Sequence, residues 1–185
     1  MGKLVAAINM TLDGFCDHTA VNADDEMHDY YTELLRSAGA VLYGRVTYQL
    51  MESYWPSVVT NPTGNRSTDE FASAIQDVSK IVFSRTLKGV SWHNAKLAAK
   101  GLEQEASDLK RQLDKDVFLG SPSLIAALTE LDIIDEYQLN IHPVIAGSGL
   151  PLFKGISRKI ELKHIRSKTL RGLGAVIHYY ERNKG

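Results

Sequence analysis

The feature that most constrains the fold of this chain is a regular alternation of short apolar segments with longer amphipathic ones. Apolar runs at 4–8, 40–43, 81–83 and 117–119 are each bounded by glycine, serine or charged residues, as is typical of strands buried on both faces of a sheet. Between them, 27–38 and 102–113 place apolar side chains three and four positions apart, as on one face of a helix. Ser121 and Pro122 carry the signals of a further helix start. This order predicts an α/β fold in three layers, with a mostly parallel sheet between helices.

The last third of the chain changes this pattern. Further strands are expected at 137–141, 160–165 and 175–180, without long helices between them. They should add an antiparallel edge and make the sheet mixed. The stretch 56–68, rich in turn-forming residues, is expected to be a surface loop. No repeat or linker divides the chain, so we expect one domain over residues 1–185.

Composition excludes several classes of function. The 185 residues include 21 basic and 22 acidic ones, a formal net charge of -1, so the basic excess of a nucleic-acid binder is missing. No apolar stretch is long enough for a membrane span, and the start of the chain, interrupted by Asp13, does not read as a secretory signal. The single cysteine, Cys16, permits neither an intramolecular disulfide nor a zinc-binding Cys/His signature. We expect a cytoplasmic protein without a metal site.

Two strand-to-helix junctions are candidate ligand sites. Gly44 and Gly120 each end an apolar run, and a helix is expected to begin at once. Glycine lets a ligand approach the backbone, and the unpaired N–H groups of a helix start attract phosphate. Arg45 adds a cation. Each glycine alone could simply form the turn between a strand and a helix. Two such junctions in one sheet are more informative, because ligands of open α/β sheets bind at the carboxyl ends of the strands.

A third junction follows the run at 81–83. Ser84 and Arg85 place a hydroxyl and a guanidinium together, which suits a phosphate monoester such as the 2′-phosphate of NADPH. The alternative is an arginine that only meets solvent. The GxGxxG fingerprint is missing, so an ordinary Rossmann domain is not predicted.

Five segments together resemble the dihydrofolate-reductase-like superfamily: VAAINMTLDGF, VLYGRVTY, KIVFSRTL, VFLGSPSLIAAL and DEYQLNIHPVIAGSGLPLF. Within it, the chain is most similar to the reductase domain of bacterial riboflavin synthesis and its stand-alone relatives. The order and spacing match over nearly the whole chain. The resemblance implies an eight-stranded, mostly parallel central sheet and an extended NADPH across the strand ends.

The resemblance also implies cofactor-binding residues. Ala7 and Ile8 would touch the nicotinamide. Phosphates would be held by Gly44, Arg45 and Thr47, and the adenosine 2′-phosphate by Ser84 and Arg85. Gly120, Ser121 and Leu124 would wrap the pyrophosphate and the nicotinamide side. Related enzymes carry Gly-Gly at the second junction, where this chain has Gly120 and Ser121.

The candidate substrate contacts are Asp13, Tyr31 and Trp55. Asp13 could instead cap the turn before Gly14, and Trp55 could fill the core. No catalytic residue is identified. Folate reductases place a carboxylate of the first helix against the pterin, and the acidic residues at 24–29 are better explained as charges that complement the helix dipole.

The leading hypothesis is a reductase that transfers a hydride from NADPH to a small heterocyclic or carbonyl substrate. By resemblance, the first substrate to consider is the 5-amino-6-(5-phosphoribosylamino)uracil of riboflavin synthesis. The alternatives are a dihydrofolate reductase, and a nucleotide-binding regulatory or interaction protein without turnover. We also expect a homodimer, because late strands would expose Leu139, Ile141, Val144 and Ile145 at an edge of the sheet.

Overall fold

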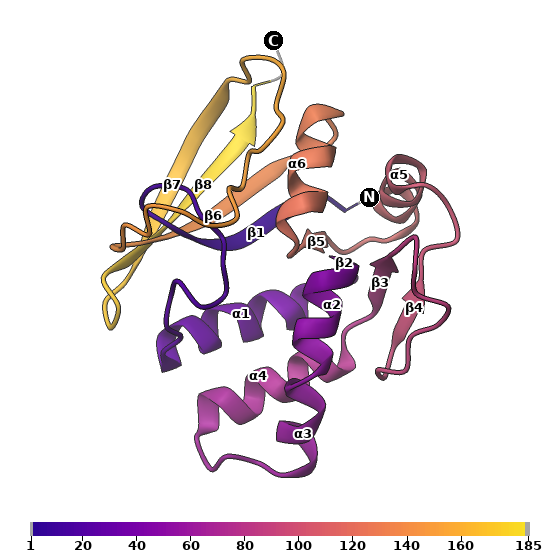
Figure 1. Ribbon diagram of the computed structural model, residues 1–185, viewed down its shortest axis with the longest axis vertical. Coiled ribbons are helices and arrows are strands. Elements are labelled where there is room, and N and C mark those ends of the chain that lie inside the picture. Colours follow the sequence, from indigo (N-terminus) through magenta and orange to yellow (C-terminus); the bar gives the residue numbers. More distant parts are fainter. Residues whose placement is uncertain (1, 184–185) are drawn as a thin grey trace.

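An eight-stranded mixed sheet forms the centre of the molecule (Figure 1). The computed structural model describes residues 2–183, and the order of its strands is β4-β3-β2-β5-β1-β6-β8-β7. None of the helices within this range is long and apolar enough to cross a membrane. The strands are β1 (Leu4–Thr11), β2 (Ala40–Gly44), β3 (Lys80–Phe83), β4 (Ala95–Leu97), β5 (Val117–Leu119), β6 (Glu136–His142), β7 (Leu162–Leu170) and β8 (Ala175–Arg182). The helices are α1 (Asp25–Ser37), α2 (Arg45–Glu52), α3 (Trp55–Thr60), α4 (Arg66–Asp77), α5 (Leu102–Gln112) and α6 (Pro122–Glu130).

Helices cover both faces of the sheet, as the alternation in the sequence predicts. Along β1, Val5 and Ala7 belong to the core packed against α1 and α4, while Leu4 and Ala6 belong to the core packed against α5 and α6. Neighbouring residues of a strand point to opposite faces, so a strand apolar at every position requires cover on both sides. The three-layer α/β/α architecture is therefore confirmed.

The antiparallel strands lie at one end of the sheet, and β6 is not its edge strand. β6 pairs in parallel with β1 and antiparallel with β8, and β8 pairs antiparallel with β7. The mixed sheet is thus confirmed, but the expectation that Leu139 and Ile141 lie on an exposed edge is wrong. Leu139 is buried, and β7, with a mainly polar exposed surface, forms the edge.

The stretch 56–68 is not one loop, contrary to our expectation. Pro56 lies in the first turn of α3, and Asn65 caps α4 by accepting a hydrogen bond from the Thr68 backbone N–H at 2.9 Å. Proline and asparagine are turn formers, but they are also favoured at helix starts. Only 61–65 connects the two helices.

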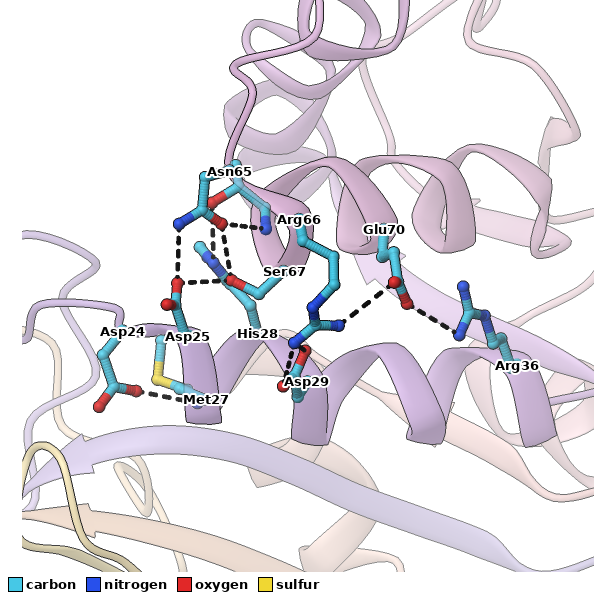
Figure 2. A network of polar contacts seen from close by, with 11 residues as sticks. Asp24, Asp25, Met27, His28, Asp29, Arg36, Asn65, Arg66, Ser67 and Glu70 are labelled. Atoms are coloured by element: carbon cyan, nitrogen blue, oxygen red, sulfur yellow. Dashed lines mark hydrogen bonds and ion pairs between the residues drawn. The ribbon is translucent and has the colours of Figure 1, made fainter.

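Polar contacts fasten α4 to α1 on the outer surface (Figure 2). The Arg66 guanidinium pairs with Asp29 at 2.8 Å and with Glu70 at 3.2 Å, and Glu70 also pairs with Arg36. Asp25 accepts hydrogen bonds from Asn65 and Ser67. Each exposed pair contributes little alone, but together they set the position of two helices that wall the cavity described below.

Candidate functional site

The two glycine junctions lie side by side. β2 and β5 are neighbours in register, with Leu42 opposite Leu119. The backbone N–H of Gly44 donates to the Ser121 hydroxyl at 2.9 Å. The starts of α2 and α6 therefore meet at one point on the carboxyl edge of the sheet, where ligands of α/β proteins bind.

A cavity of about 460 Å³ opens beside this point. Its walls come from the middle of β1, from β2 and β5, from α1 to α4, from the start of α6, from the loop after β1 and from Leu150. Its size and its mostly apolar walls are typical of small-molecule sites. Six of the residues selected from the sequence line it: Ala7, Ile8, Tyr31, Thr47, Trp55 and Gly120.

Gly44, Arg45, Ser121 and Leu124 flank the cavity without lining it. A Cβ on Gly44 would lie 3.4 Å from the Ser123 hydroxyl and 3.8 Å from Leu124, so the end of β2 is within ordinary contact distance of the start of α6. Ser121 and Leu124 are buried there. Arg45 is exposed and donates to Gln49 at 3.0 Å.

The third junction, Ser84 and Arg85 after β3, lies beside the Gly44 junction, because β3 is the neighbour of β2 in the sheet. Gly44 is opposite Phe83 in the β2–β3 register, so Ser84 and Arg85 follow directly beside it. The Ser84 hydroxyl accepts hydrogen bonds from the backbone N–H groups of Thr86 and Leu87, and thus closes the turn. Arg85 is exposed and forms no ion pair with any residue between 2 and 183.

Asp13 is not among the residues that line the cavity, and its carboxylate accepts hydrogen bonds from one side-chain hydroxyl and two backbone N–H groups. Its carboxylate accepts from the Thr11 hydroxyl at 2.6 Å and from the N–H groups of Gly147 and Ala146 at 2.7 and 3.1 Å. These bonds, the Thr11 bond above all, lower the pKa of Asp13 to about 2. The geometry matches the turn interpretation, with the carboxylate also holding the loop after β6.

A partly buried polar cluster around Asn9 is not among the residues predicted from the sequence. The Asn9 side-chain oxygen accepts from the Tyr31 hydroxyl at 3.0 Å and from the Asn140 amide at 2.7 Å, and it lies 3.3 Å from Nε2 of His142. Asn9 and Tyr31 line the cavity. Burial raises the pKa of Tyr31, so its hydroxyl stays protonated. The sequence signal that could have indicated this cluster is Asn9 itself, a polar residue within the mostly apolar strand β1.

Aromatic rings form the opposite wall. Trp55 and Phe71 meet edge to face at 4.5 Å between ring centroids, and the His28 ring stacks on Phe71 at 5.5 Å. Burial lowers the pKa of His28, which favours a neutral imidazole. Trp55 thus both packs against the core and walls the cavity, so the two interpretations of this residue are compatible.

The strand order, the covered sheet and the cavity at its carboxyl edge define an α/β protein with the dihydrofolate-reductase-like fold. Residues 2–176 match the model of the RibD C-terminal domain, and the chain belongs to this family of reductases.

Named relatives agree with this assignment. The Bacillus subtilis (strain 168) protein YyaP, which is uncharacterized, is 29% identical over 183 residues that cover 96% of this chain and 95% of YyaP. The Thermotoga maritima diaminohydroxyphosphoribosylaminopyrimidine deaminase/5-amino-6-(5-phosphoribosylamino)uracil reductase is similar in structure, with a TM-score of 0.65 and 17% identity, over 98% of this chain and 56% of that one. Dihydrofolate reductase from Enterococcus faecalis, solved with NADP(H), gives a TM-score of 0.59 at 12% identity, over 99% of this chain and 98% of that enzyme.

Proposed function

We propose that this protein is a cytoplasmic, NADPH-dependent reductase of a small heterocyclic substrate. The observation that carries the proposal is the meeting of the Gly44 and Gly120 junctions beside a cavity that β1 also lines. Phosphates favour helix starts, and a flat ring fits an apolar cavity. Membership of a reductase family supports the same conclusion.

The residues present fit a nicotinamide dinucleotide phosphate. The exposed side chains of Arg45 and Arg85 lie along the row of junctions and are available to anionic groups. Ala7 and Ile8, in the middle of β1, contribute apolar side chains to the lining of the cavity, where the nicotinamide ring would lie. When bound, the cofactor supplies a hydride, and the protein positions the reactants and excludes water.

The substrate to test first is 5-amino-6-(5-phosphoribosylamino)uracil, which the name of the Thermotoga protein specifies for that enzyme. Dihydrofolate is the alternative. It is disfavoured because Asp25 and Asp29 of α1 bond to residues of α4 (Figure 2), and no carboxylate of α1 lines the cavity. Protonation of a pterin near neutral pH needs a positioned acid.

The test is a pair of measurements on the purified protein. NADPH binding is followed by nucleotide fluorescence, and substrate-dependent NADPH oxidation is followed by absorbance with the pyrimidine and with dihydrofolate. We expect tight NADPH binding, slow to moderate oxidation with the pyrimidine and negligible oxidation with dihydrofolate. Brisk turnover of dihydrofolate would overturn the substrate assignment. Binding without oxidation for any small heterocycle would favour a nucleotide-binding protein without turnover.

A further inference from the structure

The cavity lacks the cation that a phosphorylated substrate requires. Within residues 2–183, its lining includes no lysine and no arginine. The titratable side chains that line it include the Asp17 carboxylate, which accepts a hydrogen bond from the Leu150 N–H at 2.6 Å, and the imidazoles of His18 and His28. Burial, and after it the charge of Asp17, raise the pKa of the Cys16 thiol to about 12, so this neighbour is neutral. A phosphate in the cavity would meet the Asp17 carboxylate and no lysine or arginine, an arrangement that is costly in free energy.

The cations on the surrounding elements point to other partners. α1 contributes Arg36 and α4 contributes Arg66, and both are held in ion pairs with acidic side chains on the outer surface (Figure 2). α2 contributes Arg45, at the glycine junctions where the proposed cofactor phosphates lie. β1, β2, β5, α3 and α6 contain no lysine or arginine.

The remaining lining suits a flat, uncharged ring. Trp55 and Phe71 offer aromatic surfaces beside the His28 ring, and burial lowers the pKa of His28, which favours its neutral form. At the other side, Asn9 and Tyr31 offer polar groups without a charge. Aromatic walls with few polar groups bind planar heterocycles and orient them through their ring heteroatoms or carbonyls.

We infer that the substrate of this protein is an uncharged planar compound of one or two fused rings that carries a carbonyl or imine group and no phosphate. This inference rests on the proposed reductase function and excludes the phosphoribosyl pyrimidine as the preferred substrate. In the reaction, the carbon of the C=O or C=N bond gains the hydride and its heteroatom gains a proton from solvent, while NADPH is oxidised to NADP⁺.

A matched pair of probes tests the inference on the full chain without cofactor. 2-Naphthol and 2-naphthyl phosphate share a ring system and differ in the phosphate, and binding of each is measured by isothermal titration calorimetry. We expect 2-naphthol to bind roughly tenfold more tightly or better, because the phosphate has no cation to compensate its desolvation. Equal or tighter binding of 2-naphthyl phosphate, or binding of neither probe, would overturn the inference. NADPH binding is titrated separately, so a failure of the reductase proposal is recognised independently.

Variants locate the bound probe. Trp55→Leu should weaken 2-naphthol binding several-fold through loss of ring contact, while Tyr54→Leu, at a neighbouring exposed ring, should leave it unchanged. Leu50→Arg introduces a cation into the lining, and Leu50→Gln is its neutral control. The arginine variant should gain affinity for 2-naphthyl phosphate relative to the glutamine variant. Unchanged binding in both Trp55→Leu and Leu50→Arg would place the probe outside the cavity and refute the inference.

Discussion

The Ser121 hydroxyl accepts a hydrogen bond from the backbone N–H of Gly44 at 2.9 Å and so ties the start of α6 to the start of α2. Ser121 occupies the N-cap position of α6 but makes no capping bond within its own helix. Its hydroxyl reaches sideways to the neighbouring junction instead. Ser121 therefore has a structural function, because its hydroxyl links the two junctions.

Removal of this hydroxyl should destabilise the protein. In Ser121→Ala, the Gly44 N–H stays buried without a partner, which costs about 1–3 kcal/mol of the free energy of unfolding. Ser123→Ala is the matched control, because Ser123 is exposed two positions further along the chain and its substitution should change stability by less than about 0.5 kcal/mol. Urea unfolding followed by circular dichroism measures both. Equal stability of the two variants would mean that the bond contributes nothing.

This bond also shows which parts of the site could be predicted from sequence. Gly44 and Gly120 were selected because a strand end, a glycine and a helix start are local signals. The partner of the Ser121 hydroxyl is 77 positions away, and Asn9 and Asn140 are 131 positions apart. No local pattern specifies such contacts, since they depend on which strands become neighbours in the sheet.

For the fold, too, local sequence patterns predicted some elements and not others. The buried strands and the amphipathic helix α1 were predicted because hydrophobic periodicity determines which faces are covered. The sequence does not predict β4, since its three residues, Ala95–Leu97, are too few to form a recognisable pattern. α3 and α4 were missed because the proline and asparagine at their starts were interpreted as turn signals.

Arg85 should discriminate between the two nicotinamide cofactors. Its guanidinium is exposed beside the Gly44 junction and has no acidic partner within residues 2–183. Arg85→Ala should weaken NADPH binding by about 1–3 kcal/mol and leave NADH binding nearly unchanged, because only NADPH carries the 2′-phosphate. Lys88→Ala, an exposed cation three positions away, serves as control in fluorescence titrations. Equal losses for both nucleotides would remove Arg85 from the 2′-phosphate site.

Gly120 should tolerate no β-branched side chain. A Cβ at this position would lie 3.0 Å from the Tyr43 ring, so Gly120→Val must displace a ring that lines the cavity. We expect a loss of about 1–3 kcal/mol in stability from overpacking and strongly reduced NADPH binding. Gly89→Val, where a Cβ meets no atom within 4 Å, should affect neither thermal unfolding nor the NADPH titration. Normal NADPH binding by folded Gly120→Val would show that this junction does not hold the cofactor.

Stability should fall on mild acidification because of His28. Burial lowers the pKa of His28 below 6.5 in the native state. In the range between that lowered value and 6.5, the unfolded chain binds more protons than the native one, so the free energy of unfolding decreases as the pH decreases. His28→Phe should flatten this dependence, because phenylalanine keeps the contacts with Phe71 and Trp55 and does not titrate. His142, whose pKa burial also lowers, accounts for a remaining slope. An unchanged pH profile of unfolding in His28→Phe would contradict this account.

We propose that the protein forms a homodimer through one part of the surface expected from the sequence, the part that holds Val144 and Ile145 and not Leu139 and Ile141. β6 is paired on both sides, so it offers no free edge. Exposed apolar side chains gather instead on two segments that hydrogen-bond to each other, 12–16 and 143–153. Leu12 is 62% exposed and Ile145 is 75% exposed, and contiguous apolar surface of this kind favours association. Light scattering at micromolar concentration should give about twice the 20.5 kDa of one chain. Ile145→Asp should shift the measured mass toward that of the monomer. Ile165→Asp, at an exposed apolar residue on β7, is the control and should leave the mass unchanged. A wild-type mass near 20.5 kDa would show that this surface has no second copy as its partner.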